Sequence, residues 1–241
     1  MIFTVRPSIC NTQTTYELSQ SVVEPVVDLR AWDSPVESQG SLGSCVANAV
    51  TNAYELMQNK TDSSKFKELS RLFVYWHARY LENSVEQDSG VFYIKSALDA
   101  LVKFGVCSEQ VWPYDIAQFA QQPTPDCYAD AADRRIPAYT KVECVAGMVE
   151  NISRGKPVLL GMYVYDSFLN LTTGENTVLM PSNTDLPVGG HAVLAVGYSQ
   201  TDQQILIKNS FGTVWADAGY AWLPYSYIEK YAFDKWIFDI V

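Results

Sequence analysis

The chain has 241 residues, of which 48% are hydrophobic and 18% are charged, and its formal net charge is -10. This length suffices for one large domain or two small ones with a sizeable core. An acidic surface repels phosphate backbones, so we exclude nucleic acid as a partner. No apolar run approaches the roughly 18 residues of a membrane span, so we also exclude a membrane partner.

The N-terminal stretch from Met1 to Pro7 lacks the basic patch and the apolar run of a signal peptide. We therefore expect an intracellular protein, or one that is secreted by a non-classical route or whose signal has been trimmed. Residues 1–25 are polar and rich in Thr, Ser and Gln. They predict an irregular N-terminal arm with one strand near Ile2–Val5.

Residues 26–115 show the 3.6-residue periodicity of amphipathic helices. One helix is predicted over Ser44–Met57, with Gly40 and Gly43 allowing a tight turn before it. A second is predicted over Ser70–Leu81. Ser89 is predicted to cap a third, which ends near Gly105. This half is therefore mainly helical.

Residues 116–241 are predicted to be mainly β. Prolines are frequent in 112–138, which predicts a loop that crosses between the two halves. Beyond it, short runs of aliphatic and aromatic residues separated by turn residues predict strands at 158–165, 192–198, 205–208, 220–223 and 236–240. A helical half followed by a β half predicts an α+β fold with a site in the cleft between the halves.

The five cysteines include no C-x-x-C pair, and only two histidines are present, so no metal site is predicted. Cys45 stands apart because it begins a predicted helix. The other four allow three disulfide pairings, which the sequence does not rank, or they are small buried hydrophobic residues. Those four are Cys10, Cys107, Cys127 and Cys144.

Cys45 is the best candidate nucleophile. A thiol becomes a good nucleophile when it loses its proton, and both a helix N-terminus and an imidazolium lower its pKa. Cys45 follows Gln39–Ser44 and opens an amphipathic helix, so it has the first of these. Cys107, by contrast, follows a helix end, where the dipole raises a thiol pKa.

His191 is the better candidate for the base. His77 lies in the middle of a helix, which is typical of a packed histidine. His191 follows two glycines at the start of a predicted strand. Asn209 ends the next strand, and a hairpin around 201–204 would bring it beside His191. An asparagine there would orient the imidazole and fix its tautomer.

Acyl transfer also needs donors for the oxyanion that develops on the substrate carbonyl. The backbone N–H of Cys45 is one candidate donor. The side-chain amide of Gln39, six residues before Cys45, is another.

Three segments together resemble the papain/cathepsin family of cysteine proteases. Residues 35–45 resemble its nucleophile segment, 189–198 its histidine segment and 208–220 its asparagine segment. The family places its histidine and asparagine about 130–150 residues after the cysteine. Here the intervals are 146 and 164 residues, in the family's order. The resemblance covers residues 26–241.

This resemblance implies a two-lobe papain-like fold, with a helical lobe, a β-barrel-like lobe and the active site between them. It implies hydrolysis of peptide bonds in a peptide or protein substrate through a thioester acyl-enzyme, without a cofactor. By motif position, the catalytic residues would be Cys45, His191, Asn209 and Gln39. Trp215 would shield Asn209, and substrate would contact Ser89, Gly90, Gly190 and Trp215.

The departures from the family pattern indicate a divergent branch. Leu42 stands where the family has a disulfide-forming cysteine, and Val46 stands where it has a bulky aromatic. Phe211 replaces a tryptophan and Ala216 a glycine. Residues 1–25 are much shorter than the family's inhibitory propeptide. They are a short propeptide lying in the cleft, an arm that binds a partner, or a simple extension.

Two other classes of function compete with an active peptidase. One is a cysteine acyltransferase or amidase on a related fold, which usually has Asp in the third position, so Asn209 argues against it. The other is a catalytically silent binding protein on the papain fold. The complete set of four reacting groups argues against that alternative, because a silent relative has no chemical need for all four.

Overall fold

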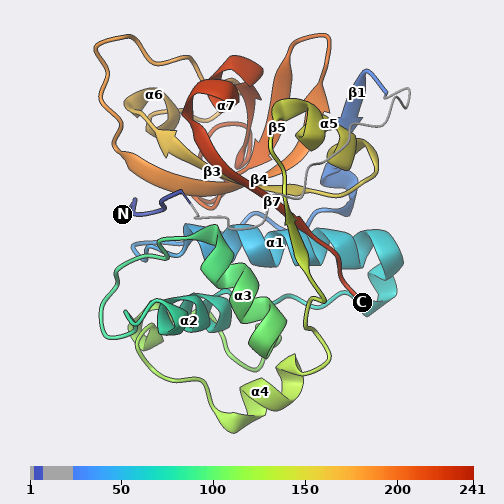
Figure 1. The fold of residues 1–241 in the computed structure, drawn as a ribbon, viewed down its shortest axis with the longest axis vertical. Helices are drawn as coiled ribbons and strands as arrows, with labels where there is room; N and C mark the ends of the chain where they lie inside the picture. Colours follow the sequence, from blue (N-terminus) through green and yellow to red (C-terminus); the bar gives the residue numbers. More distant parts are fainter. Residues whose placement is uncertain (1–2, 8–23) are drawn as a thin grey trace.

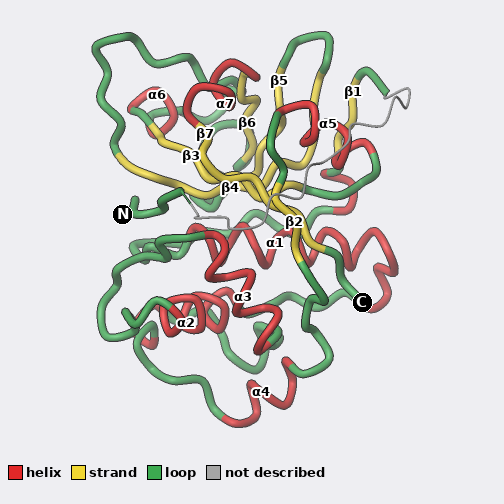
Figure 2. Tube along the Cα trace, in the orientation of Figure 1, coloured by secondary structure: helices red, strands yellow, loops and turns green. Residues whose placement is uncertain are grey.

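The computed structural model describes residues 3–7 and 24–241. The expectations for the rest of the N-terminal arm, and for Cys10 within it, lie outside the described residues. The described chain forms two lobes, one mainly helical and one built on an antiparallel sheet (Figure 1). Helix α1 lies between them, and the colouring by secondary structure in Figure 2 separates the two lobes clearly. The expected α+β class is confirmed.

The helical lobe is built on four α-helices, α1 to α4, whose buried residues pack together, and on three short 3-10 helices that bury no residue. Its central helix begins at Cys45, and every residue from Cys45 to Met57 is buried because both lobes pack on it. The second helix begins after Ser70, whose hydroxyl accepts a hydrogen bond from the backbone N–H of Phe73. The elements are η1 (Arg30–Trp32), α1 (Cys45–Asp62), η2 (Ser63–Lys65), α2 (Arg71–Leu81), α3 (Ile94–Phe104), η3 (Ile116–Gln118) and α4 (Pro125–Ala131).

Two predictions about this lobe are wrong. Ser89 does not cap the third helix, which begins at Ile94 after Tyr93. Instead, Ser89 and Gly90 belong to a loop, where Gly90 has a φ of +71°. The segment 112–138 is also more than a loop, since it contains α4, whose Pro125 occupies the first turn where proline is tolerated. Gly105 ends α3 as expected, with a φ of +75°.

The second lobe is built on one antiparallel sheet with the strand order β2-β7-β3-β4-β5-β6, and β1 pairs with β4 off this path. All five predicted strands are present, and each differs from its predicted range at one end or both. Three short helices cover this lobe, and none of them was anticipated. The elements are β1 (Val26–Asp28), β2 (Tyr139–Lys141), α5 (Val145–Ser153), β3 (Val158–Val164), α6 (Asp166–Leu169), β4 (Gly189–Ser199), β5 (Gln204–Lys208), β6 (Tyr220–Pro224), α7 (Tyr225–Tyr231) and β7 (Ala232–Phe238).

The hairpin of β4 and β5 carries the site residues of this lobe. Its strands are antiparallel, and Leu194 lies opposite Lys208. His191 therefore begins one strand near the point where Asn209 ends the other. The ammonium of Lys208, fully buried, donates to the carboxylate of Asp33 at 2.9 Å and to the carbonyl of Ser34 at 2.8 Å. This ion pair fixes the end of β5 to the segment that leads into residues 39–44. We call these residues the nucleophile loop because they directly precede Cys45, the predicted nucleophile.

Candidate active site

Cys45 is the first residue of α1, and its side chain is only 1% exposed. The backbone N–H groups of Ala192 on β4, and of Val46 and Cys45 in the first helical turn, lower the pKa of its thiol. The first N–H groups of a helix have no acceptor within the helix, so they are free to stabilise a negative charge there. The contact with Ala192 places the thiol beside the residue that follows His191.

His191 and Asn209 are in direct contact, as the hairpin predicted. His191 Nε2 lies 2.8 Å from Asn209 Oδ1. The backbone N–H of Ser210 donates to the same Oδ1 at 2.8 Å, and a backbone N–H can only donate. The asparagine atom facing His191 is therefore its oxygen, so Nε2 carries the imidazole proton and Nδ1 keeps its lone pair. Within the described residues Nδ1 has no hydrogen-bond partner.

Burial dominates the electrostatics of this pair. Desolvation raises the pKa of the Cys45 thiol from 9.0 to about 11, against the lowering effect of the three backbone N–H groups. Desolvation likewise lowers the pKa of His191 from 6.5 to about 4, against the raising effect of Asn209. Burial therefore favours the neutral form of both groups in this arrangement.

Gln39 is buried in a loop that contacts both lobes. Its backbone N–H donates to the carbonyl of Ser210 at 2.9 Å, and its side-chain Oε1 accepts from the Ser210 hydroxyl at 2.6 Å. Its Nε2 donates to the carbonyl of Leu42 at 2.8 Å. An amide nitrogen carries two hydrogens, so one remains for a substrate oxygen near the N-terminus of α1.

Aromatic rings enclose the imidazole of His191. Phe211 lies 4.9 Å from it between ring centroids, and Phe168 and Phe3 each lie 5.7 Å away in edge-on arrangements. Trp215 packs on Phe168 at 5.0 Å and donates its indole N–H to the backbone carbonyl of Phe168 at 3.1 Å. Trp215 is only 5% exposed, and it packs on Phe168, one of the rings that enclose His191.

The described part of the N-terminal arm contacts both lobes. Thr4 forms a parallel bridge with Gly190, and the N–H of Val5 donates to the Gly190 carbonyl at 3.4 Å. On the opposite lobe, a Cβ added at Gly90 would lie 2.1 Å from the Thr4 hydroxyl. The arm thus touches two of the glycines that the sequence predicts to contact substrate. The predicted strand near Ile2–Val5 is described only from Phe3 onward, where it makes this single bridge.

Arg6 of the arm also contacts the helical lobe, at Phe92. The N–H of Arg6 donates to the carbonyl of Phe92 at 2.5 Å, and its guanidinium carbon lies 4.7 Å from the centre of the Phe92 ring. Ser89, the remaining predicted substrate contact, is partly buried and donates its hydroxyl to the carbonyl of Gly90 at 3.0 Å. The backbone of this loop is therefore occupied by the arm rather than open.

The nucleophile loop is held without the disulfide that Leu42 rules out. The backbone N–H of Gly43 donates to the Asp88 carboxylate at 3.0 Å, and the Tyr75 hydroxyl donates to the same oxygen. A Cβ added at Gly43 would lie 2.7 Å from the Cα of Gly90, so these loops are in close contact. Hydrogen bonds and close packing therefore hold the nucleophile loop against the loop that contains Asp88 and Gly90.

Several residues of the site were not predicted from the sequence. Ser210 orients both Gln39 and Asn209, and its position directly after Asn209 could have suggested this. Phe168 and Asp88 reach the site only through the tertiary fold.

The described cysteines are all free, Cys144 being exposed and Cys45, Cys107 and Cys127 buried. Within residues 3–7 and 24–241 no cluster of three or more His, Cys, Asp or Glu could hold a metal ion. None of the helices described there is long and apolar enough to span a membrane.

Comparison with known proteins gives one consistent result. The model of the papain family of cysteine proteases matches residues 23–234. An uncharacterised peptidase C1-like protein, L477, of Acanthamoeba polyphaga mimivirus is 32% identical and is covered to 81%, with 98% of this chain aligned. Cysteine proteinase 2 of Zea mays is 27% identical. The alignment covers 78% of this chain and 51% of that relative.

Solved structures agree with the sequence comparisons. Xylellain, a cysteine protease from Xylella fastidiosa, superposes with a TM-score of 0.88 at 31% identity, covering 99% of this chain and 96% of that one. The bromelain protease from Ananas comosus, solved with the inhibitor E64, has a TM-score of 0.71 at 22% identity, with 91% of this chain and 100% of that one covered, and supports the fold alone. With a family model that spans most of its length, the chain belongs to the papain family of cysteine proteases.

Proposed function

We propose that the chain is an active cysteine peptidase that hydrolyses peptide bonds through a thioester acyl-enzyme. The observation that carries this proposal is the state of the His191 ring. Its Nε2 is held by Asn209, and its Nδ1 has no other hydrogen-bond partner among the described residues. His191 Nδ1 is therefore available to act as a base. The residue that follows His191 in the chain is Ala192, and the backbone N–H of Ala192 lowers the pKa of the Cys45 thiol.

In the first step, His191 Nδ1 takes the proton of the Cys45 thiol, and the thiolate attacks the scissile carbonyl carbon. The electron pair of the C=O bond moves to its oxygen, where the Gln39 amide and the backbone N–H of Cys45 stabilise the charge. The tetrahedral intermediate then collapses. The C–N bond breaks, and the protonated His191 gives its proton to the leaving amine, which leaves a thioester on Cys45.

In the second step, neutral His191 takes a proton from water, and the resulting hydroxide attacks the thioester carbonyl. Collapse of the second tetrahedral intermediate breaks the C–S bond. The imidazolium returns its proton to the thiolate, and the acid product leaves. Asn209 holds the ring in one orientation and one tautomer throughout both steps.

We also propose that the N-terminal arm inhibits the enzyme by occupying the cleft. Phe3 lies edge-on against His191, while Thr4 and Val5 pair with Gly190. A substrate strand needs the same backbone groups and the same space. Phe3 also covers the His191 ring, and burial lowers the pKa of that imidazole, so displacement of the arm favours proton transfer from the Cys45 thiol to His191.

The proposal is tested by labelling with an epoxide inhibitor of papain-like enzymes, with the modified residue located by mass spectrometry. We expect one equivalent on Cys45 and none elsewhere, and we expect the label to be lost in His191→Ala. Cys144 serves as an internal control because it is exposed and lies outside the site. Cleavage of a mixed library of peptides identifies the reaction as peptide hydrolysis.

Three results would count against the proposal. Labelling of Cys144 in preference to Cys45 would show that Cys45 is not activated. Labelling of Cys45 without cleavage of any peptide would favour an acyltransferase or amidase. No labelling of folded protein, with or without the substitution Val5→Pro in the arm, would favour a silent binding protein.

A further inference from the structure

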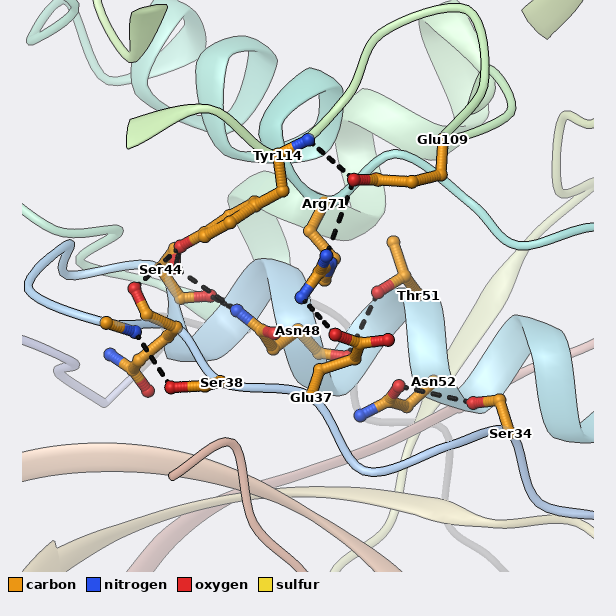
Figure 3. Close-up of polar contacts among 12 residues, drawn as sticks. Ser34, Glu37, Ser38, Ser44, Asn48, Thr51, Asn52, Arg71, Glu109 and Tyr114 are labelled. Atoms are coloured by element: carbon orange, nitrogen blue, oxygen red, sulfur yellow. Dashed lines mark hydrogen bonds and ion pairs between the residues drawn. The ribbon is translucent and has the colours of Figure 1, made fainter. Parts of the chain in front are cut away.

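Beneath the nucleophile loop, a continuous series of hydrogen bonds connects its two ends (Figure 3). Asn48 Nδ2 donates to the Ser44 hydroxyl at 3.1 Å, and the Ser44 hydroxyl lies 2.5 Å from the Tyr114 hydroxyl. The Tyr114 hydroxyl donates to the backbone carbonyl of Gln39 at 2.9 Å. These residues come from α1, from the loop before it and from a distant segment that follows α3.

The direction of each hydrogen bond follows from the groups involved. A carbonyl oxygen only accepts, so the single phenolic hydrogen of Tyr114 points to Gln39. The Ser44 hydroxyl must then donate to the Tyr114 oxygen and accept from Asn48. Burial raises the pKa of Tyr114, so the phenol keeps its proton at neutral pH. Each of these groups has one role, and the series has one arrangement.

Tyr114 therefore touches both ends of the segment that builds the reacting centre. Gln39 carries the proposed oxyanion donor, and Ser44 directly precedes the nucleophile Cys45. Between them lie Gly40, with a φ of +60°, and Gly43, so the loop has little stiffness of its own. A single hydroxyl hydrogen-bonded to both ends fixes their separation.

The phenol is itself held by a partly buried ion-pair group. Arg71 donates to Glu37 at 2.7 Å and lies 3.4 Å from a Glu109 oxygen, and its guanidinium carbon sits 4.3 Å from the centre of the Tyr114 ring. Glu109 also accepts from the backbone N–H of Tyr114 at 2.5 Å. Arg71 begins α2, where a positive charge opposes the helix dipole. These contacts offset that unfavourable position, and Figure 3 shows them converging beside Tyr114.

We infer that Tyr114 is a positioning residue for the oxyanion site, and that Arg71 keeps it in place. This inference rests on the proposed peptidase function. Tyr114 touches no substrate. Its hydroxyl holds the Gln39 donor at a fixed distance from Cys45, and transition-state stabilisation by such donors depends on their being held in place.

The test is the substitution Tyr114→Phe, which removes one oxygen and keeps the ring on which Arg71 stacks. We expect kcat for a peptide substrate to fall by about 10- to 100-fold, with KM within about twofold, because misplacement of a donor weakens the transition state more than substrate binding. Tyr139→Phe is the matched control. It also removes a phenol hydrogen bond, to Asp99 at 2.5 Å, but on strand β2 away from the site.

Two chemical probes separate positioning from a general structural effect. A peptide aldehyde forms a hemithioacetal with Cys45, and its oxygen occupies the position of the oxyanion. Iodoacetamide alkylates the same thiol without forming an oxyanion. We expect Tyr114→Phe to weaken aldehyde inhibition by about the factor lost in kcat, and to leave the alkylation rate within about twofold of the wild type.

A double-substitution cycle connects the effect to Gln39. If Tyr114 acts through the Gln39 amide, Tyr114→Phe has little further effect in Gln39→Ala, so the two losses are not additive. Arg71→Lys keeps the charge but loses the stacked, forked geometry, and we expect a smaller loss of the same kind.

Equal falls in aldehyde affinity and alkylation rate would overturn the inference, as would additive losses in the cycle or unchanged kcat in a folded Tyr114→Phe protein. Failure of the proposed function gives a different result. In that case neither the wild type nor Val5→Pro, in which the arm is displaced, cleaves any peptide, and Gln39→Ala changes nothing.

Discussion

The two histidines of this chain provide a controlled comparison between its lobes. Both are buried, His77 at 1% and His191 at 0% exposure, and burial lowers the pKa of each from 6.5 to about 4. Both are packed among aromatic rings. By burial, charge and surroundings, they are nearly equivalent.

Their hydrogen bonds differ. Both ring nitrogens of His77 have partners, since Nδ1 lies 2.9 Å from the carbonyl of Phe73 and Nε2 lies 3.2 Å from the Tyr128 hydroxyl. His191 has Asn209 on one nitrogen and no hydrogen-bond partner for the other within the described residues. A buried polar atom without a partner is costly, so it is retained where chemistry requires it. The unpaired nitrogen, and not the pKa, therefore distinguishes the proposed base, His191, from His77.

The first prediction concerns the two histidines themselves. His191→Ala removes the proposed base, and we expect kcat/KM for a fluorogenic peptide to fall by at least about 10³-fold. His77→Gln keeps a polar side chain in the helical lobe, and we expect it to change kcat/KM by less than about threefold, since no residue of the site contacts His77. Similar losses in two folded variants would show that His191 has no special role.

The second prediction removes one partner of each histidine. Asn209→Ala frees the imidazole of His191 to rotate and to change tautomer, so we expect kcat to fall by about 10²-fold. Tyr128→Phe removes the Nε2 partner of His77, and we expect kcat to be unchanged. Steady-state kinetics on both variants measures the contrast, which disappears if Asn209 serves only to stabilise the fold.

The third prediction concerns the arm that covers only one of the two histidines. At pH 7 a thiol with a pKa of about 11 is thiolate in about one molecule in 10⁴. Val5→Pro removes the N–H that donates to Gly190, so we expect the arm to leave the cleft and Cys45 alkylation at pH 7 to rise at least about tenfold.

A matched variant controls for this change. Val26→Pro also replaces a valine near the N-terminus with proline, but this valine is exposed and lies on β1, which pairs with residues 197–199 of β4. We expect its alkylation rate to stay at the wild-type value. If Val5→Pro also leaves the rate unchanged, the arm does not protect the thiol.

The fourth prediction concerns stability at acidic pH, where we expect the two histidines to behave alike. Between pH 6.5 and 4 the unfolded chain binds a proton at each histidine while the folded chain does not, so each costs stability as the pH falls. For His77 the shift from 6.5 to about 4 corresponds to about 3 kcal/mol at pH 4.

Urea unfolding of the wild type and His77→Gln across this range measures that difference. We expect the stability of the variant to fall less steeply with decreasing pH, by about 1.4 kcal/mol per pH unit. Glu55 has the opposite sign, because burial raises its pKa from 4.5 to about 7, but it is present in both proteins and cancels in the difference. Parallel curves would show that His77 accepts its proton in the folded state.

Local sequence patterns were sufficient for much of the fold. The periodicity of 44–57 and 70–81 predicted α1 and α2, and short apolar runs predicted β3 to β7. The patterns failed where structure depends on packing. The four residues of α6 are too few to show a period, and α4 lies in a segment whose prolines suggested a loop, although Pro125 stands at a position that begins a helix.

The sequence by itself determined which groups could react. It contains one cysteine that begins a helix, one histidine at the start of a strand and one asparagine at the end of the next, and these follow from short-range patterns and from the three motifs. A hairpin is a local structure, so even the contact of His191 with Asn209 could be expected before any coordinates.

Only the tertiary structure decided how those groups are held and covered. Tyr114 meets Gln39 across 75 positions of sequence, and Asp88 meets Gly43 across 45. Thr4 reaches Gly190 from the far end of the chain. Such contacts come from the global packing of both lobes on α1, and no local pattern encodes them, because hydrogen bonds between distant segments impose no periodicity on either one.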